Sequence, residues 1–269
     1  IHSYSRKHMA RQRAIFYLEF WSITMASNTV GILGGMGPAA GADFVRLFVQ
    51  ACAEYMKAHG IAVVDQAYPE HWLAQLPIPD RSAALLAPET AQDPLPMMRA
   101  GMDKLQAVGA VAVAISCNTA HAWHERLQQA YPQIQVLHIA RVVAQRLQQQ
   151  GHSACMLLAT QGTYRIGLYD QALAACGITV HLPQDAEREQ LMHGIYQGVK
   201  ADKLDMARSD FAQVAKAMRT RHGDVPLIMG CTEIPLALPG AAEVAGMPLV
   251  DPAQELARAL AQVAYGEKL

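Results

Sequence analysis

Short apolar runs rich in β-branched residues alternate along the chain with longer stretches in which apolar side chains recur every three or four positions. Phe44, Leu47 and Phe48 show this helical spacing, as do Leu256 and Leu260. Runs that are apolar throughout and alternate with helices are typical of parallel sheets covered by helices. The pattern therefore predicts an α/β fold. The expected strands are residues 29–33, 61–65, 110–116, 135–139, 154–159, 225–230 and 247–251.

Two segments of the chain repeat one pattern, VAVAISCNTAHAW from residue 111 and VPLIMGCTEIPLA from residue 225. In each, an apolar strand ends in a small residue and a cysteine, and a threonine that could open a helix follows within two positions. We therefore expect two similar, Rossmann-like parallel-sheet domains with a pseudo-twofold relation. The ligand crevice of such sheets lies beyond the carboxyl ends of the strands. Both cysteines should therefore face an active site in the cleft between the domains.

The predicted domains divide the chain at the repeated segments. Residues 30–139, joined by the last helix in 252–269, would form the first domain and carry Cys117. Residues 140–251 would form the second domain and carry Cys231. The chain would then cross between the domains twice, which predicts a two-stranded hinge that lets the cleft close.

The first 29 residues differ from the rest of the chain. They are basic up to Arg13 and apolar from Ala14, but Glu19 interrupts the apolar run. A carboxylate in so short a run disfavours both a signal peptide and a membrane helix. Met25 lies just before the first expected strand and would make a natural start. We expect residues 1–29 to be a leader outside the fold, and we expect no membrane association.

The composition of the chain argues against some classes of binding partner and some kinds of site. The 22 Lys and Arg residues balance 23 Asp and Glu residues without a block of one sign, so the charge pattern does not support a nucleic-acid partner. The five cysteines, at positions 52, 117, 155, 176 and 231, include no C-x-x-C pair. This spacing argues against a disulfide framework and a structural metal site, and it indicates a reducing, cytoplasmic compartment.

The glycine-rich segment GILGGMGPAAG, residues 31–41, follows an expected strand and opens an expected helix. Its glycines at 31, 34, 35 and 37 fit neither the dinucleotide-binding nor the phosphate-binding spacing. Two interpretations stay open. The glycines could bring backbone close to a small ligand, with amides available for an anion, or they could form a tight turn between strand and helix.

Two of the five cysteines stand out by their position. Free cysteine usually behaves as a small buried hydrophobe, whereas Cys117 and Cys231 each end an apolar strand where polar residues begin. Helix-opening N–H groups after a thiol would favour its thiolate. Two opposed thiols suit inversion at carbon, because one can remove a proton from one face while the other delivers a proton to the opposite face. A cysteine paired with His121 as its base would need no second cysteine.

Six segments resemble the aspartate/glutamate racemase family, and within it most resemble the cofactor-independent aspartate racemases. These segments are GILGGMGP, PDRSA (79–83), CNTAHA (117–122), LLATQGT (157–163), GIYQGVKA (194–201) and GCTEIPL (230–236). The resemblance runs from about Val30 to the C-terminus. It implies an isomerase that interconverts L- and D-aspartate by two-base proton transfer at Cα, without pyridoxal phosphate or another cofactor. It also implies a homodimer.

The resemblance further implies which residues form the site. Two would be acid/base thiols, three would hold the α-carboxylate of the substrate, two would grip its side-chain carboxylate and one would line the pocket. In that order they are Cys117 and Cys231, then Asn118, Thr119 and Thr232, then Arg81 and Lys200, then Met36. A planar arginine fork suits a carboxylate and a lysine adds a point charge.

Two neighbouring residues receive no catalytic role. A histidine in the first turn after a strand, such as His121, is more often a surface or capping residue. Glu233 stands where glutamate racemases of the family carry histidine, and a carboxylate beside a thiol raises the thiol pKa. Three alternatives stay open: a racemase for glutamate or for a broad range of amino acids, a decarboxylase or isomerase of the same superfamily, and a non-catalytic amino-acid-binding protein.

Overall fold

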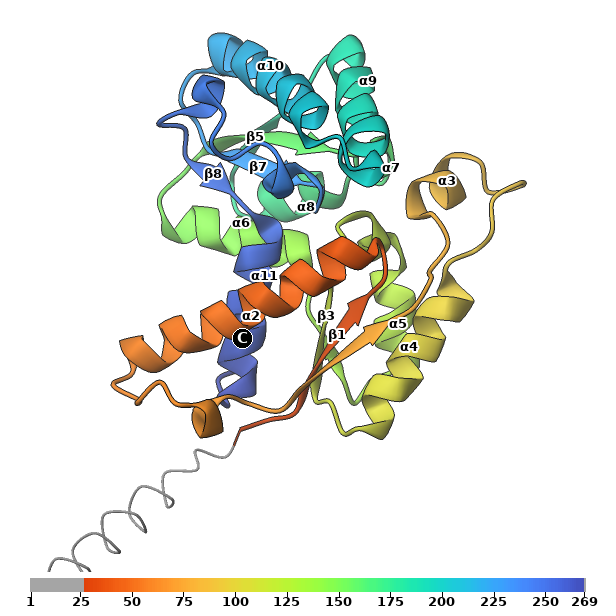
Figure 1. Ribbon diagram of the computed structural model, residues 1–269, viewed down its shortest axis with the longest axis vertical. Coiled ribbons are helices and arrows are strands. Elements are labelled where there is room, and N and C mark those ends of the chain that lie inside the picture. Colours follow the sequence, from red (N-terminus) through yellow and green to blue (C-terminus); the bar gives the residue numbers. More distant parts are fainter. Residues whose placement is uncertain (1–26, 269) are drawn as a thin grey trace, which may run out of the picture.

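The computed structural model describes residues 27–268, which form two parallel sheets with helices packed around them (Figure 1). The first sheet has the strand order β2-β1-β3-β4 and the second has the order β6-β5-β7-β8. All neighbouring strands pair in parallel. The strands are β1 (Val30–Gly34), β2 (His71–Gln75), β3 (Ala112–Ile115), β4 (Gln135–Val136), β5 (Ala154–Ala159), β6 (Thr179–His181), β7 (Leu227–Gly230) and β8 (Leu249–Val250). The predicted α/β fold of two similar parallel sheets is confirmed.

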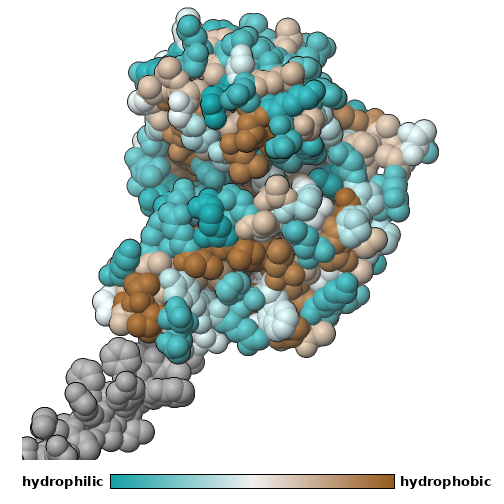
Figure 2. All heavy atoms as spheres, in the orientation of Figure 1, coloured by the Kyte–Doolittle hydropathy of each residue, from teal (hydrophilic) through white to brown (hydrophobic). Residues whose placement is uncertain are grey.

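Ten α-helices connect the strands within the described part of the chain. They are α2 (Pro38–Ala58), α3 (Arg81–Leu86), α4 (Leu95–Ala107), α5 (His124–Ala130), α6 (Ile139–Gln149), α7 (Gln161–Arg165), α8 (Leu168–Ala175), α9 (Asp185–His193), α10 (Leu204–His222) and α11 (Pro252–Ala264). In the view of Figure 2, hydrophilic side chains cover much of α10, whereas apolar side chains gather along α2. None of the helices within residues 27–268 combines the length and the apolar character that a membrane crossing requires.

Two short strands were not expected from the sequence, and one expected strand is absent. Residues 61–64 have irregular backbone and lead into the 3-10 turn η1 (Asp65–Ala67), so the predicted strand at 61–65 is wrong. Val63 and Val64 are 42% and 37% exposed. The edge strand β2 forms instead, with only Ala74 buried. β-branched residues favour a strand only where the strand packs on a neighbour, which this stretch lacks.

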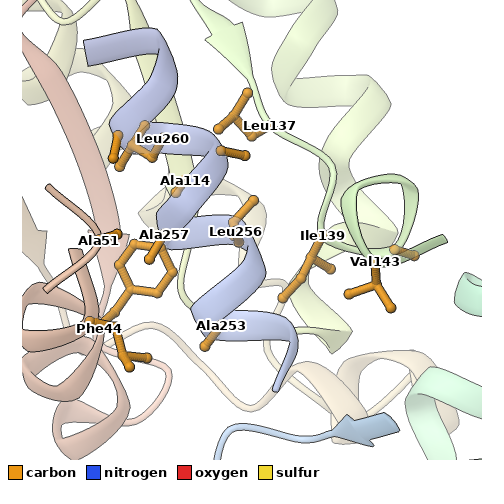
Figure 3. Close-up of a cluster of buried hydrophobic side chains, with 14 of the residues drawn as sticks. Phe44, Ala51, Ala114, Leu137, Ile139, Val143, Ala253, Leu256, Ala257 and Leu260 are labelled. Atoms are coloured by element: carbon orange, nitrogen blue, oxygen red, sulfur yellow. The ribbon is translucent and has the colours of Figure 1, made fainter. Parts of the chain in front are cut away.

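One hydrophobic core extends from the first sheet to the second. It contains Phe44 of α2, Leu157 of β5 and Tyr169 of α8, together with the inner faces of α6 and α11. Figure 3 shows Phe44, Val143 and Leu256 directed into this common cluster from α2, α6 and α11. Two further cores cover the remaining faces, one on each sheet. Because both sheets pack on this core, it fixes the position of the carboxyl ends of one sheet relative to those of the other.

The chain passes between the two halves through α6 and α11. Each of these helices follows the last strand of its half, and each has a side-chain cap, from His138 and Asp251 respectively. The two helices pack against each other and belong to the core that both sheets share. The predicted domain limits, at 139/140 and 251/252, fall at the beginnings of these two helices and stay a prediction.

The fold begins slightly before the predicted position. The backbone N–H of Asn28 donates to the carbonyl of Ala264, and its side-chain amide donates to the carbonyl of Val263. Thr29 accepts a hydrogen bond from the N–H of Val111. These two residues, which the sequence assigned to the leader, therefore join the fold. The rest of that prediction, from residue 1 to residue 26, lies outside the described residues.

Candidate active site

The structure brings all eight residues singled out from the sequence to one cavity between the two sheets. They are Met36, Arg81, Cys117, Asn118, Thr119, Lys200, Cys231 and Thr232. Five further residues complete the lining, namely Asp80, Ser82, Thr160, Tyr196 and Glu233. The cavity has a volume of about 20 Å³. That is room for about one water molecule, so an amino acid can enter only if the walls move apart.

The two cysteines occupy equivalent positions in the two halves. Cys231 directly follows β7, and Cys117 follows β3 after a single serine. Both β3 and β7 are the third strand of their half, and the carboxyl ends of parallel strands form the ligand crevice of such sheets. The cysteines are only 6% and 7% exposed. The repeated strand-cysteine pattern thus places both thiols at the same cavity.

The backbone after each cysteine forms a short 3-10 turn rather than entering an α-helix at once. Thr119 begins the turn η2 (Thr119–Trp123), and the turn η5 (Ile234–Leu236) follows Cys231 by three residues. The expectation that the threonine opens a helix holds only for Thr119, and there only as a 3-10 turn, because the residue before η5 is Glu233 and not Thr232. A short turn has a weaker dipole than a long helix, so the backbone after each cysteine offers a thiolate less support than expected.

The glycine-rich segment forms a tight turn from β1 into α2. Gly35 has a φ of +93°, and a Cβ built there would lie 1.8 Å from the carbonyl oxygen of Leu76. Glycine is therefore required for a steric reason. The same turn brings Met36 to the cavity wall. The structure supports the turn interpretation.

Arg81 is buried and tied to backbone carbonyls on two sides. Its Nη1 donates to the carbonyls of Ile78 and Pro79, at 3.1 and 2.9 Å, and its Nη2 donates to the carbonyl of Met36 at 2.7 Å. Nε has no hydrogen-bond partner among residues 27–268. Because a guanidinium has five N–H groups, Nε–H and one N–H of Nη2 remain for an anion.

The charge on Arg81 is maintained by its surroundings. Burial by itself would lower the pKa of Arg81, but the adjacent Cys117 sulfur and the Asp80 and Glu233 carboxylates raise that pKa above its ordinary value. Arg81 therefore stays positive inside the protein. Its guanidinium is the group that can offset negative charge on Cys117 when this thiol gives up its proton.

The thiol of Cys231 has the opposite environment. It donates a hydrogen bond to Glu233, with Sγ 2.9 Å from Oε2, and the hydroxyl of Thr232 donates to the same oxygen at 3.1 Å. Burial and then the negative charge of Glu233 raise the pKa of Cys231 well above its usual range. This corrects the expectation that the backbone would favour a thiolate here. The direction is the one expected for a carboxylate beside the thiol.

Lys200 lies between two carboxylates that come from different halves of the molecule. Its Nζ is 3.9 Å from Oε1 of Glu233 and 4.0 Å from Oδ2 of Asp80. It also lies 4.3 Å from the ring centroid of Tyr196. Both distances to oxygen exceed that of a direct hydrogen bond, so the ammonium group can turn toward another anion.

Asp80 joins the two halves at the cavity wall. Its Oδ1 caps α3 by accepting from the N–H of Ala83, and its Oδ2 accepts from the hydroxyl of Tyr196 at 3.0 Å. Burial by itself would raise the pKa of Asp80, but these hydrogen bonds, together with the charges of Lys200 and Arg81, hold that pKa below its usual value. Asp80 and Tyr196 lie inside the segments PDRSA and GIYQGVKA, yet residue type alone did not single them out.

The turn after Cys117 is fixed by side chains of the second half. The hydroxyl of Thr119 lies 2.9 Å from that of Thr160 and 3.0 Å from that of Thr163, and the latter two are 3.1 Å apart. The side-chain oxygen of Asn118 accepts a hydrogen bond from the hydroxyl of Tyr169. The side chain of Thr119 is thus engaged in a triangle of hydroxyls, whereas Asn118 keeps its amide N–H groups.

His121 is buried beneath the same turn. Its Nδ1 donates to the carbonyl of Cys117 at 2.9 Å, and its Nε2 accepts from the N–H of Ile139 at 3.2 Å. Burial, followed by the nearby His138 and His124, lowers the pKa of His121 to about 3. The residue is therefore neutral, and it connects the Cys117 turn to the first residue of α6. The alternative of a surface histidine is wrong, because His121 is buried, whereas its contact with Ile139 at the start of α6 fits the capping alternative.

Residues 27–268 contain no group of three or more His, Cys, Asp or Glu side chains arranged to hold a metal ion. All five cysteines are free thiols.

Comparisons with known proteins agree on one family. The family model for Asp/Glu/Hydantoin racemase matches residues 33–260. A broad specificity amino-acid racemase of Bacillus subtilis is 26% identical over 208 residues, which cover 76% of this chain and 85% of the relative. The structure of Picrophilus torridus aspartate racemase aligns with a TM-score of 0.73 and 26% identity, over 90% of this chain and 96% of that chain.

A more distant structure shares the fold. Glutamate racemase from Francisella tularensis, in complex with D-glutamate, aligns with a TM-score of 0.55 and 16% identity, over 88% of this chain and 81% of that chain. The family match covers both halves of the fold and both cysteine segments. The chain therefore belongs to the Asp/Glu/hydantoin racemase family, whose members named here are racemases and hence isomerases.

Proposed function

We propose that this protein interconverts L- and D-aspartate by proton transfer at Cα, with Cys117 and Cys231 as the two acid/base groups and without pyridoxal phosphate. The observation that carries the proposal is the shared cavity, where both thiols meet Arg81 and Lys200. The similarity to an aspartate racemase structure supports aspartate as the substrate.

The charges around the cavity support an acidic amino acid. Aspartate brings two carboxylates and one ammonium group, and the cavity wall offers the cations Arg81 and Lys200 as well as the carboxylates Asp80 and Glu233. Arg81 keeps two N–H groups for an anion, and a guanidinium suits a carboxylate. Lys200 can exchange its distant carboxylate neighbours for a closer substrate oxygen. We assign these two cations to the side-chain carboxylate of the substrate.

The reaction needs stabilisation of the charge that appears when Cα loses its proton. That charge spreads onto the α-carboxylate, and donors aimed at this group lower the barrier because they are already in place. The free amide N–H groups of Asn118 and the turns that contain Thr119 and Thr232 would supply such donors. Met36 would limit the space around Cα from the side of the glycine-rich turn.

The two thiols have neighbours of opposite charge, which suits one acid and one base in a given direction of the reaction. Cys231 holds its proton because of burial and Glu233, so it would act as the acid. Cys117 lies beside the Arg81 guanidinium, which stabilises a thiolate, so it would act as the base. In the reverse direction the roles exchange, because the forward reaction leaves Cys231 without its proton and Cys117 with one.

Entry of the substrate requires the cavity to widen. The contacts of Asp80 with Tyr196 and Lys200 join the two halves at the cavity wall. We infer that these contacts break when the cleft opens and form again over the substrate. Closure of this kind excludes water from the reacting groups.

A second candidate function is racemisation of a wider range of amino acids. The similarity to the broad specificity racemase of Bacillus subtilis favours it. Such an enzyme would use the same thiols, with less dependence on Arg81 and Lys200. We further propose a homodimer, which rests on the family resemblance, and a reducing, cytoplasmic compartment, which rests on the free cysteines. Light scattering and fractionation of the source cells test these two points.

The decisive experiment is incubation of the purified protein with L-aspartate in heavy water without added cofactor. We expect deuterium at Cα and formation of D-aspartate, followed by mass spectrometry and chiral chromatography. L-glutamate and other amino acids run in parallel distinguish the narrow from the broad substrate range. Absence of exchange with every amino acid would overturn the proposal in favour of another reaction or a binding role.

Variants then test the two-thiol scheme. Cys117→Ala and Cys231→Ala should each abolish racemisation, because each direction needs both an acid and a base. Cys176→Ala is the matched control, since Cys176 is a free thiol that does not line the cavity. Full two-way turnover by either of the first two variants would refute the scheme.

A further inference from the structure

Asn118 receives a hydrogen bond from a residue that does not touch the cavity. The hydroxyl of Tyr169 on α8 lies 2.5 Å from Oδ1 of Asn118. Both side chains are buried, and Tyr169 has no exposed surface at all. Tyr169 lies in the core that the two halves share, whereas Asn118 lines the cavity. The bond therefore links the interior of the second half to the ligand-facing turn of the first.

The chemistry of the two groups fixes the orientation of the amide. A side-chain amide has one end that accepts and one end that donates two N–H bonds. No other acceptor among residues 27–268 takes the O–H of Tyr169. If the amide of Asn118 were reversed, its NH₂ would face Tyr169 and the buried O–H would lose its acceptor, which is unfavourable. The phenol thus selects the orientation in which Oδ1 points into the core.

The phenol keeps its proton at any pH at which the protein works. Burial, followed by the charges of Asp251, Cys155 and Cys231, raises the pKa of Tyr169 well above its usual value. Tyr169 therefore stays a donor. The opposite end of the Asn118 amide, Nδ2, makes no hydrogen bond to any of the described residues. It is also not fully buried. It is left as a donor on the cavity side.

We propose that Tyr169 is a positioning residue, which orients the Asn118 amide so that Nδ2 faces the substrate carboxylate. This inference rests on the proposed function, in which Asn118 holds the α-carboxylate. Without the phenol, Oδ1 would have to stay buried without a partner each time Nδ2 binds a carboxylate. The second half of the molecule thereby determines the hydrogen-bonding polarity of a site residue in the first half.

A double-mutant cycle tests the inference by racemisation kinetics on the wild type, Tyr169→Phe, Asn118→Ala and the double variant. We expect Tyr169→Phe to raise KM for aspartate about tenfold, the effect of leaving a buried polar atom without its partner, and to lower kcat as well, because the N–H groups of Asn118 also stabilise the charge that develops on the α-carboxylate. In the Asn118→Ala background, Tyr169→Phe should leave KM unaltered, because the amide through which it acts is gone.

Tyr164→Phe is the matched control. Tyr164 also donates its hydroxyl within the second half, to the carbonyl of Leu157, and it does not line the cavity. Its replacement should leave KM at the wild-type value. A wild-type KM for Tyr169→Phe, or the same increase of KM with and without Asn118, would overturn the inference.

A second variant keeps the test decisive if Tyr169→Phe does not fold. Asn118→Asp preserves an acceptor for Tyr169 and replaces the cavity-facing N–H groups by an oxygen. We expect binding of succinate weakened by about 100-fold or more, because two carboxylates then face each other. Wild-type affinity for succinate in this variant would overturn the inference. If the wild-type protein binds succinate but does not racemise aspartate, the proposed function is refuted and the inference about Tyr169 is not.

Discussion

The thiol of Cys231 donates a hydrogen bond to the carboxylate of Glu233, whereas its counterpart Cys117 lies beside the guanidinium of Arg81. The two cysteines end equivalent strands, so their backbone positions are alike. Their electrostatic neighbours have opposite signs. A fold that repeats itself thus carries an asymmetric pair of thiols, one held protonated and one next to a positive charge. This asymmetry suits a reaction that begins with one acid and one base.

Removal of the negative charge next to Cys231 should make this thiol more acidic. Because Glu233 raises the pKa of Cys231, Glu233→Gln should lower that pKa, although burial should keep it above the ordinary value. The measurement is the ultraviolet absorbance of the thiolate as a function of pH. It compares the protein with Glu233 and the Glu233→Gln variant, each carrying Cys117→Ser. Glu243→Gln, at an exposed position of the same half, is the control. An unchanged titration would show that Glu233 does not set the protonation of Cys231.

Loss of the ammonium group at the cavity should weaken the binding of aspartate. We expect Lys200→Gln to raise KM for aspartate about tenfold or more, since a charged hydrogen bond to a carboxylate is lost. Steady-state kinetics measures this effect. Lys203→Gln removes an exposed lysine three positions away and should behave like the wild type. Equal KM values for both variants would remove Lys200 from the proposed binding site.

Substitution of Gly35 should damage the fold more than substitution of a glycine with similar backbone. Gly35 and Gly60 both have positive φ, at +93° and +68°, but only Gly35 would bring a Cβ against backbone, that of Leu76. Gly60→Ala should cost about 1 kcal/mol in the free energy of unfolding from backbone strain alone. Gly35→Ala should cost several times as much or prevent folding. Urea denaturation measures both, and equal losses would contradict the steric argument.

Stability should fall as the pH is lowered from about 6.5. The pKa of His121 is lowered to about 3 and that of His138 to about 4, so between these values and 6.5 the unfolded chain binds protons that the folded protein does not. The stabilisation is complete above pH 6.5 and is lost toward pH 3, by up to about 1.4 kcal/mol per pH unit for each histidine. Urea denaturation at a series of pH values measures the slope.

His121→Gln should reduce that slope, since one of the two titrating groups is removed. His59→Gln is the control, because His59 is exposed at the end of α2. The same slope in His121→Gln and in the wild type would mean that other groups account for the acid sensitivity. A reduced slope would support a buried neutral imidazole under the Cys117 turn.

The sequence predicted the general fold but not every strand. Apolar strands such as 154–159 carry their signal locally, because they are buried on both faces. The edge strand β2 and the short β6 have mixed polarity and were not predicted. The β-branched run at 61–65 was predicted as a strand but does not form one. Whether such a stretch joins a sheet depends on the neighbour beside it, and the sequence does not state which segment that neighbour is.

The sequence by itself predicted that the two cysteines share a cavity, since the strand-cysteine segments are local patterns, and the family resemblance added six of the other lining residues. Only the tertiary structure decided how these side chains are charged and oriented. Asn118 and Tyr169 are 51 positions apart, and Asp80 and Tyr196 are 116 positions apart. The protonation of a thiol, the direction of an amide and the partners of a guanidinium depend on such distant neighbours and on burial. These are properties of the folded chain, in which charges act across space rather than along the sequence.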